Sequence, residues 1–316
     1  MRTPVRVLST LGDADLLALP ADLRAEVEVT VVPMKDPLPP GVEGDVLVTV
    51  PTAAGHHLPE AFRRGVRWVH VTGTGIDGIP LEGFGSEVVL TNSRGASAVA
   101  ISEWVLAVML AFEKQLPQMW LREAPPAWHR VASLGTLARR RLALVGLGGI
   151  GLATARRALA FDMSVRALRN TSAASPHPEV ELARSLTELL ADADHVVVAA
   201  PLTERTRHLL GAEAFALMKP GVHLVNIARG GLIHTDALRE ALDNGTVAMA
   251  SLDAVEPEPL PAGHWLYAHP NVRLSPHVSW GSPDAFPEIL RAFADNLRRF
   301  VAGEPLESVV DPAQGY

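Results

Sequence analysis

The chain has 316 residues, of which 48% are hydrophobic and 20% charged, and its formal net charge is −7. This length accommodates two domains with apolar cores, and without a clustered basic run the composition argues against a nucleic-acid-binding protein. There is no cysteine, which excludes disulfides, thiolate nucleophiles and zinc–thiolate sites.

The first part of the chain alternates short β-rich runs with helical or loop stretches. It begins with a strand-like pattern and lacks the apolar core of a signal peptide, and no apolar run reaches the length of a membrane span, so we expect a cytoplasmic protein. Strands that alternate with helices predict a mostly parallel sheet with right-handed crossovers. The expected strands are Val5–Ser9, Val27–Val32, Asp45–Val50, Trp68–Val71 and Val88–Thr91.

The stretch ISEWVLAVMLAFEK (101–114) is predicted to be a helix. Ile101, Val105, Val108 and Phe112 recur at helical spacing, and the other face of the helix is also apolar. We therefore expect this helix to be buried on several sides, as suits the junction between two domains.

A second alternating series follows. We expect Thr235 to cap one of its helices and Asn244-Gly245 to end it, and a last helix to end at Gly303. The expected elements are strands Leu142–Val145, Val165–Leu168, His195–Ala199, His223–Ile227, Val247–Leu252 and Val272–Leu274, and helices 151–161, 236–243 and 284–302.

The segment LALVGLGGIGLATARRALAF (142–161) has the pattern of a dinucleotide-binding turn. An apolar strand leads into Gly146-x-Gly148-x-x-Gly151, and an amphipathic helix follows. In such turns one glycine permits the tight bend, one lets the backbone approach a pyrophosphate, and one lets helix and strand pack closely. The phosphates then interact with the free N–H groups at the positive end of the helix. The turn therefore predicts a dinucleotide site.

The end of the next predicted strand indicates which dinucleotide is preferred. NAD-binding versions carry an acid about 20 residues after the glycines, where it binds the ribose 2′-hydroxyl. Here the strand ends at Arg169-Asn170, and Arg169 lies eighteen positions after Gly151. A guanidinium offers a 2′-phosphate a charge-assisted forked donor. We therefore expect NADP(H) to be preferred, with NAD(H) as the alternative cofactor. The other interpretation of Arg169 is a surface arginine that binds no ligand.

Three later segments each follow a predicted strand and supply an arginine, a carboxylate and a histidine. They are LVNIARGGLI with Arg229, LDAVEPEPL with Glu256 and Glu258, and LSPHVSWGS with His277. The carboxyl ends of the strands in a doubly wound sheet are where ligands bind. Residue chemistry alone does not separate the two glutamates.

These residue types suit proton transfer to a polarised carbonyl group. A histidine titrates near pH 6.5 and can supply the proton, and a nearby carboxylate favours the imidazolium. An arginine can bind the substrate carboxylate with two donors and polarise the carbonyl. His56-His57 has no third ligand at plausible spacing, so we interpret it as a polar loop and expect no metal site.

Across nearly its whole length the chain resembles the D-2-hydroxyacid dehydrogenase family. The stretches that carry the resemblance are VTGTGIDGI (71–79), TNSRGASAVAISEWVLAVML (91–110), GLGGIG (146–151), APLTERTRHLLGAEAFALMKPGVHLVNIARGGLIHTDALREAL (200–242), LDAVEPEPL (252–260) and SPHVS (275–279).

The resemblance implies an active site formed by Arg229, Glu258 and His277. Glu258 is selected because the family places its glutamate five residues after a strand-end aspartate, here Asp253. That aspartate is expected to receive the nicotinamide carboxamide. The remaining cofactor contacts implied are Gly146, Gly148, Gly149, Ile150, Gly151, Arg169, Asn170, Pro201, Thr206, Ile227 and Ala228.

The resemblance also implies a substrate-binding loop at TGTG (72–75). The backbone amides of Thr74 and Gly75 are expected to bind the substrate carboxylate, beside Arg229 and His277. Trp280 departs from the small residue that is common in relatives. It either lines and narrows the substrate pocket or packs against the last helix, and both interpretations stay open.

The fold implied is α/β, with two doubly wound parallel-sheet domains. A Rossmann cofactor domain, residues 99–281, is expected to be inserted into a flavodoxin-like substrate domain formed by residues 1–98 and 282–316. The family also suggests a homodimer through the ISEWVLAVML region, although packing between domains would produce the same apolar pattern.

The function expected is an NADPH-preferring reductase that converts a small 2-keto acid, of the glyoxylate or hydroxypyruvate type, to the D-2-hydroxy acid. His277 would donate the proton, and the partners would be the small-molecule substrate, with no nucleic acid and no membrane. The alternatives are a bulkier keto acid, another small anion such as phosphite, or a dinucleotide-sensing protein resembling the corepressors of this family.

Overall fold

The computed structural model describes residues 3–12, 19–85, 87–128 and 133–316, without the side chains of residues 52–54 and 56. The chain divides into two compact units. Met1–Ser97 and Ser282–Tyr316 form the first unit, and Ala98–Gly281 form the second. Each unit has its own parallel sheet.

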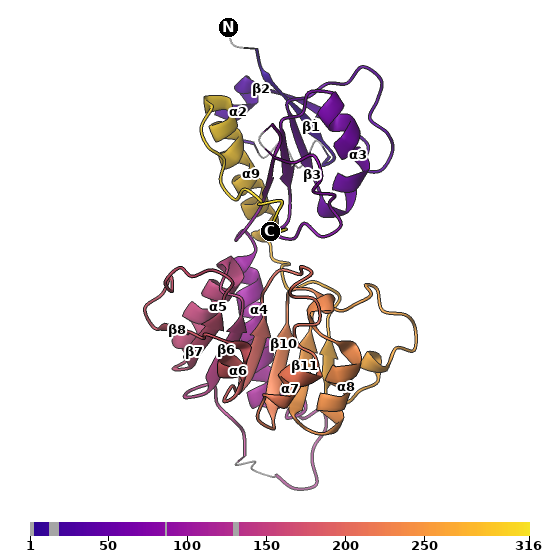
Figure 1. Cartoon of the computed structure of the whole chain (residues 1–316). Helices are drawn as coiled ribbons and strands as arrows, with labels where there is room; N and C mark the ends of the chain where they lie inside the picture. Colours follow the sequence, from indigo (N-terminus) through magenta and orange to yellow (C-terminus); the bar gives the residue numbers. More distant parts are fainter. Residues whose placement is uncertain (1–2, 13–18, 86, 129–132) are drawn as a thin grey trace. The chain divides into compact units, whose positions relative to one another are not determined.

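The first unit contains a five-stranded parallel sheet in the order β2-β1-β3-β4-β5. This is the flavodoxin-like strand order. Alternate residues of its strands face opposite sides, so Leu8 and Leu47 pack towards α3 while Val7 and Val46 pack towards α2 and α9. Figure 1 shows α3 on one side of this sheet and α2 and α9 on the other. The elements are β1 (Val5–Ser9), α2 (Ala21–Glu26), β2 (Val27–Val31), β3 (Val46–Thr49), α3 (Pro51–Arg63), β4 (Trp68–Val71), β5 (Val89–Asn92) and α9 (Ala285–Ala302).

The second unit contains a seven-stranded parallel sheet in the order β12-β11-β10-β9-β6-β7-β8. Numbered from its own first strand, this is the Rossmann order with one strand added at an edge. Helices α4 and α5 cover one face, and α6, α7 and α8 cover the other (Figure 1). The elements are α4 (Ala98–Glu113), β6 (Arg141–Val145), α5 (Gly149–Leu159), β7 (Ser164–Leu168), β8 (Val180–Leu182), α6 (Leu186–Leu190), β9 (His195–Val198), α7 (Ala212–Ala216), β10 (Val222–Asn226), η1 (Gly230–Leu232), α8 (Thr235–Asp243), β11 (Val247–Leu252), η2 (Trp265–Tyr267) and β12 (Val272–Leu274).

The expected α/β fold class is confirmed, and all the predicted strands are present within about one residue of their expected ends. The prediction missed helix α3 and the short elements α2, β8, α6 and α7. The four short elements have three to six residues, too few for a periodic pattern to be distinguished from a loop.

Two local predictions are wrong. His56-His57 lies in α3, which has proline at its first position, where a missing N–H is tolerated, and not in a loop. His57 is buried, and its Nε2 lies 2.7 Å from the carbonyl oxygen of Pro33. The N-cap of α8 is His234 instead of Thr235, because the His234 ring accepts the N–H of Ala237 and Thr235 already belongs to the helix.

Helix α4 is only partly enclosed. Ile101, Val105 and Met109 are buried against α5 and the sheet of the second unit, whereas Val99 is 57% exposed. The expectation of burial on several sides therefore holds along the stripe that packs within this unit and fails at Glu103 and Ala107, which are exposed.

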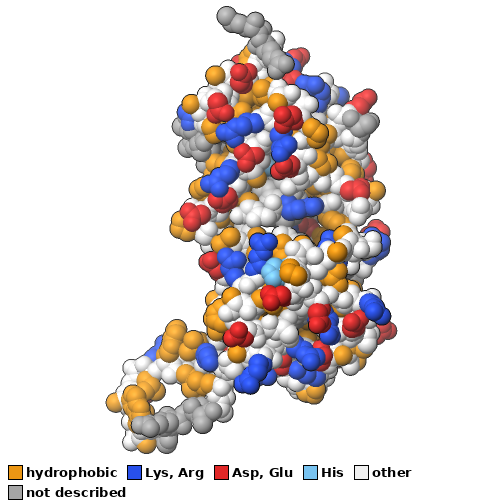
Figure 2. All heavy atoms as spheres, turned by 90° about the vertical axis from the view of Figure 1, so that its left-hand side faces the viewer, with side chains coloured by type: hydrophobic (Ala, Val, Ile, Leu, Met, Phe, Trp, Pro, Cys, Tyr) orange, Lys and Arg blue, Asp and Glu red, His pale blue; other side chains and the backbone are white. Residues whose placement is uncertain are grey.

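The surface drawn in Figure 2 mixes basic and acidic side chains over the face that it shows. Within the part of the chain that the structure describes, no helix is long and apolar enough to span a bilayer. Among the same residues, no three histidine or acidic side chains are grouped in a way that would hold a metal ion.

A buried histidine in the first unit predicts how stability depends on pH. His70 in β4 is fully buried between the hydroxyl oxygens of Thr91 and Ser93, at 2.8 and 3.1 Å, and burial lowers the pKa of His70 from 6.5 to about 3. The unfolded chain binds this proton below pH 6.5 and the folded chain does not. The stability that neutral His70 preserves is therefore lost as the pH falls from 6.5 towards 3.

We expect wild-type protein to lose about 2 kcal/mol more unfolding free energy than His70→Gln between pH 7 and pH 5. Glutamine keeps hydrogen-bonding capacity but does not titrate, so the comparison isolates the His70 proton from other groups. Urea unfolding followed by circular dichroism at both pH values measures the difference. Equal pH dependence in the two proteins would contradict the assignment.

Candidate active site

The glycine turn after β6 is built by close backbone contacts. Gly146 has φ +106°, and a Cβ at this residue would lie 2.8 Å from the backbone of Ala199. Only glycine satisfies both conditions. A Cβ on Gly151 would overlap the Gly146 carbonyl oxygen, so this glycine lets the start of α5 pack on the turn.

The middle of the turn is open. Gly148 is the N-cap of α5, no side chain caps the helix, and a Cβ on Gly148 would meet nothing within 4 Å. The first N–H groups of an α-helix have no partner within the helix and carry its positive dipole end. The backbone at Gly148, Gly149 and Ile150 therefore fits the pyrophosphate of a dinucleotide.

The predicted adenosine residues lie at the end of β7. Arg169 follows the strand directly and is partly buried, and its Nη1 donates to the carbonyl oxygen of Ala174 at 3.3 Å. Asn170 is exposed. The guanidinium thus lies beside its own loop at the carboxyl end of the strand that neighbours β6.

Two further strand ends carry predicted cofactor residues. After β9, the Thr206 hydroxyl donates to the carbonyl oxygen of Pro201 at 2.7 Å and accepts the N–H of Thr203 at 2.7 Å. After β10, Ile227 is buried and Ala228 is partly buried. Strands β9 and β10 are parallel neighbours, so these residues lie along one edge of the sheet.

The predicted catalytic histidine and one glutamate are in contact. His277 Nδ1 lies 2.8 Å from Glu258 Oε2, and the side chains are each 39% exposed. The other Glu258 oxygen accepts the N–H of Val255 at 3.0 Å, which orients the carboxylate. His277 has φ +55°, and its N–H donates to the carbonyl oxygen of Asp253 at 3.0 Å. Because Nδ1 faces Glu258, Nε2 is the ring nitrogen left to exchange a proton with a ligand.

The second glutamate has a different partner. Glu256 accepts from Arg207 Nη1 at 3.1 and 3.2 Å, and the side chains are 45% and 49% exposed. This pair lies over Gly231, where a Cβ would be 3.0 Å from the Glu256 carboxylate. The structure thus separates the two glutamates that residue chemistry left equivalent.

Arg229 lies just after β10, in the loop before η1. Its Nη1 donates to the carbonyl oxygen of Ala228 at 2.7 Å, and the residue is partly buried. Strands β10, β11 and β12 are consecutive parallel neighbours, so the segments with Arg229, Glu258 and His277 leave the sheet at the same edge.

Asp253 is buried, and its carboxylate accepts three hydrogen bonds from the segment that carries His277. The donors are the Ser275 hydroxyl at 2.5 Å and the backbone N–H groups of Val278 and Ser279, both at 2.9 Å. A carboxylate has about four acceptor positions. The expected contact of Asp253 with the nicotinamide carboxamide stays a prediction. In the structure, the Asp253 carboxylate holds the segment that carries His277 through these three hydrogen bonds.

The remaining predicted residues lie in two places. Trp280 is 44% exposed, and its indole N–H donates to the His277 carbonyl oxygen at 3.1 Å, which anchors the ring beside the histidine. Thr74 and Gly75 belong to the loop after β4 in the first unit. The Thr74 carbonyl oxygen accepts from Asn92 Nδ2 at 2.8 Å.

The polar side chains that hold these loops were not among the residues predicted from the sequence. Asn226 binds the loop of Arg229, Ser275 binds Asp253, and Asn92 binds Thr74. The available signal was weak, namely a polar residue at the end of an otherwise apolar strand, as in LVNIARGG and VVLTNS.

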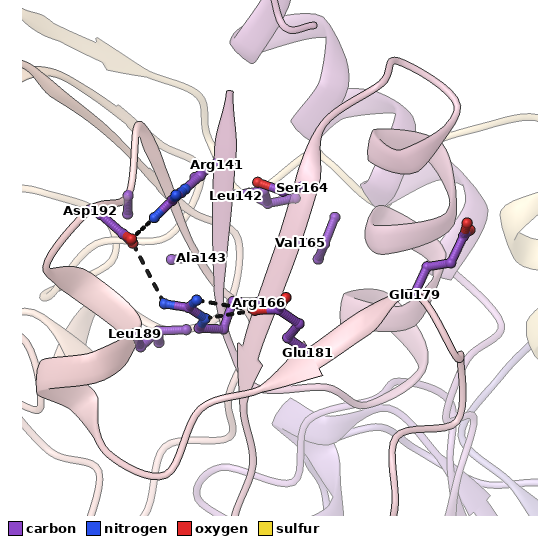
Figure 3. Close-up of a pocket in the computed structure, with 11 residues that line it drawn as sticks. Arg141, Leu142, Ala143, Ser164, Val165, Arg166, Glu179, Glu181, Leu189 and Asp192 are labelled. Carbon is purple, nitrogen blue, oxygen red and sulfur yellow. Dashed lines mark hydrogen bonds and ion pairs between the residues drawn. The ribbon is translucent and has the colours of Figure 1, made fainter. Parts of the chain in front are cut away.

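A separate hollow of about 160 Å³ lies on the second unit and contains no predicted site residue (Figure 3). Arg166 pairs there with Glu181 at 3.0 Å and with Asp192 at 3.6 Å, and Arg141 also pairs with Asp192. These ion pairs connect β6, β7 and β8 with the turn after α6.

The amino-acid sequence is similar to those of known proteins. The family described as "D-isomer specific 2-hydroxyacid dehydrogenase, NAD binding domain" matches residues 106–279. The chain is 34% identical over 242 residues to D-3-phosphoglycerate dehydrogenase of Bacillus subtilis (strain 168). That match covers 76% of the chain but only 46% of the relative, so the chain spans about half the length of that protein. It is 35% identical over 234 residues to glyoxylate/hydroxypyruvate reductase B of Pectobacterium carotovorum, covering 71% of the chain and 72% of the relative.

Solved structures have a similar fold over nearly the whole length of the chain. The D-isomer specific 2-hydroxyacid dehydrogenase of Xanthobacter autotrophicus Py2, in complex with NADPH and MES, has a TM-score of 0.82 at 28% identity, covering 99% of this chain and 100% of that one. Apo D-mandelate dehydrogenase of Rhodotorula graminis has a TM-score of 0.81 at 25% identity, covering 98% of each chain. The chain belongs to the D-isomer specific 2-hydroxyacid dehydrogenase family.

Proposed function

We propose that this protein is an NADPH-preferring reductase that converts a small 2-keto acid to the D-2-hydroxy acid. The observation that carries the proposal is the 2.8 Å contact between His277 and Glu258, with Arg229 on a neighbouring strand end. Among its relatives are proteins named glyoxylate reductase and glyoxylate/hydroxypyruvate reductase, which favours a substrate of this size.

The proposed chemistry divides among three side chains. A bound reduced nicotinamide would supply the hydride to the keto carbon. His277, its Nδ1 donating to Glu258, would present a proton from Nε2 to the carbonyl oxygen. The Glu258 carboxylate accepts from His277 Nδ1 and so fixes the ring orientation. Arg229 would bind the substrate carboxylate and stabilise charge that develops on the carbonyl oxygen.

We assign dinucleotide binding to the second unit and substrate-carboxylate binding to the TGTG loop of the first, in line with the expected domains 99–281 and 1–98 with 282–316. In the second unit the pyrophosphate would bind at the start of α5, and the nicotinamide side would involve Ile227, Ala228 and Asp253. Thr74 and Gly75 would supply the backbone amides. Trp280, anchored on the His277 carbonyl, would border the substrate and limit its size.

Arg169 is the basis of the proposed NADPH preference. It occupies the strand end where an acid would bind the ribose of NAD, and its guanidinium would bind a 2′-phosphate. The related protein of Xanthobacter autotrophicus forms a complex with NADPH, which favours the same cofactor here.

A bulkier keto acid is the second candidate. The structural neighbour named D-mandelate dehydrogenase takes its name from an aromatic hydroxy acid and has the same fold. A dinucleotide sensor without turnover is less favoured, because the histidine, glutamate and arginine segments all meet at one sheet edge. We also propose a homodimer through the ISEWVLAVML region of α4, where Glu103 and Ala107 are exposed.

The test is an initial-rate panel of glyoxylate, hydroxypyruvate, pyruvate and phenylpyruvate, each with NADPH and with NADH. We expect turnover with NADPH ahead of NADH, and a fall in kcat of about 10²–10⁴-fold in His277→Ala, because general acid catalysis contributes about that much. Oxidation of 3-phosphoglycerate belongs in the panel, because two relatives carry that activity in their names. Cofactor binding without turnover on any substrate would reject the reductase.

The two glutamates provide a matched pair. Glu258→Gln keeps an acceptor for His277 Nδ1 but removes the charge, so we expect kcat/KM to fall by about 10–100-fold. Glu256→Gln removes the exposed pair with Arg207 and should change kcat/KM by less than about twofold. Steady-state kinetics of both variants measure this, and equal losses would reject the assignment of Glu258.

Cofactor preference is tested at two arginines of the same strand region. Arg169→Asp should lower the ratio of kcat/KM for NADPH over NADH by about tenfold or more, because a carboxylate repels the 2′-phosphate. Arg166→Gln is the control, since Arg166 pairs with Glu181 and Asp192 in the hollow of Figure 3. If the ratio is unchanged in Arg169→Asp, its assignment to the 2′-phosphate is wrong.

A further inference from the structure

Asn226 is the last residue of β10 and is fully buried, three residues before Arg229. We infer that Asn226 is a positioning residue that holds Arg229 in place for the substrate carboxylate. The inference rests on the proposed function, because it assumes that Arg229 binds the substrate carboxylate.

The Asn226 side chain joins two loops. Its Nδ2 donates to the carbonyl oxygen of Arg229 at 2.9 Å and to that of Ala254 at 3.1 Å. Its Oδ1 accepts the N–H of Ala228 at 3.1 Å. A carboxamide has two donors and an acceptor on one planar group, so asparagine satisfies all three positions. Aspartate lacks the donors, and alanine lacks all three groups.

The two loops that Asn226 joins are in direct backbone contact. A Cβ on Gly230 would overlap the backbone of Val255 and Glu256, so nothing separates the turn after Arg229 from the turn that leads to Glu258. The Asn226 carbonyl oxygen also accepts the N–H of Asp253 at 2.9 Å. With these contacts present, the backbone of Arg229 has little freedom to move.

The guanidinium contacts a residue that Asn226 also holds. Arg229 Nη1 donates to the Ala228 carbonyl oxygen, and the N–H of Ala228 donates to Asn226 Oδ1. Loss of the Asn226 side chain therefore removes a hydrogen bond that fixes the backbone of Ala228, whose carbonyl oxygen the guanidinium contacts. We therefore expect loss of the Asn226 side chain to lower the affinity for a carboxylate ligand.

His277 is held by other groups. Its ring contacts Glu258, and its segment is bound by the Asp253 carboxylate through the N–H groups of Val278 and Ser279. None of these bonds involves the Asn226 side chain, which reaches Glu258 only through the peptide between Ala254 and Val255: its carbonyl accepts from Asn226 and its N–H donates to Glu258. A change at Asn226 should therefore weaken carboxylate binding more than it alters proton transfer.

The experiment measures oxalate binding by calorimetry with protein saturated in NADPH. Oxalate is a planar dicarboxylate that tests the Arg229 site without turnover. For Asn226→Ala and Asn226→Asp we expect the Kd for oxalate to rise by about tenfold or more, because two buried carbonyl groups lose their donor. The Kd for NADPH should change by less than about twofold.

Asn296→Ala is the matched control for lost stability. Asn296 is also buried, and its side chain also holds a loop, in the first unit. Its Nδ2 donates to the Glu307 carbonyl oxygen, and its Oδ1 accepts the N–H of Glu307. This variant should lose thermal stability without a change in the Kd for oxalate. If oxalate affinity instead follows the melting temperature in all variants, the positioning role is wrong.

A double-mutant cycle shows whether Asn226 acts through Arg229. In an Arg229→Lys background, which keeps a cation, Asn226→Ala should change the Kd for oxalate by less than about twofold, because the positioned guanidinium is already absent. An undiminished tenfold effect would overturn the inference.

The outcomes also separate the inference from the proposed function. Wild-type protein that binds oxalate but reduces no keto acid would overturn the proposed activity, while the variants would still decide the role of Asn226. Wild-type protein that neither binds oxalate nor turns over would overturn both. Turnover in the wild type with unchanged oxalate affinity in both Asn226 variants would overturn the positioning role alone.

Discussion

The candidate site depends on one constraint, that parallel strands end at the same edge of their sheet. Strands β10, β11 and β12 are consecutive parallel neighbours in the second unit. The loops after them carry Arg229, Glu258 and His277. The glycine turn after β6 and the arginine after β7 lie at that edge too. No long-range bend is needed to assemble these groups, because the sheet itself aligns the points where the chain leaves it.

Buried polar side chains convert this alignment into defined contacts. A loop backbone offers N–H and carbonyl groups that need partners once water is excluded. Asn226 and Asp253, at or just after the ends of adjacent strands, supply them. Asn226 binds the loops after β10 and β11, and Asp253 binds the loop after β12. Each loop that carries a proposed catalytic side chain is thus tied to the strand end beside it.

The carboxylates near the site each have a different hydrogen-bond partner. Glu258 contacts His277, Glu256 contacts Arg207, and the acceptors of Asp253 are used within the histidine segment. Each carboxylate has a distinct neighbour, so of these three only Glu258 contacts the His277 ring. An exposed ion pair such as that of Glu256 contributes little to stability. Its place over Gly231 instead shows how tightly the turns are packed.

The sequence by itself determined the alternating strands, the glycine turn and therefore the α/β class, because these follow from local periodicity and backbone sterics. It also indicated Arg229 and His277 as strand-end residues. Residue chemistry left open which glutamate meets His277, and the family resemblance pointed to Glu258. Only the tertiary structure shows the contact itself, because it joins residues 19 positions apart and the competing pair joins residues 49 apart. The same holds for Asn226 and for the helical site of His57. Their roles depend on which backbone groups lie opposite them, and that is set by packing between segments that no short-range pattern encodes.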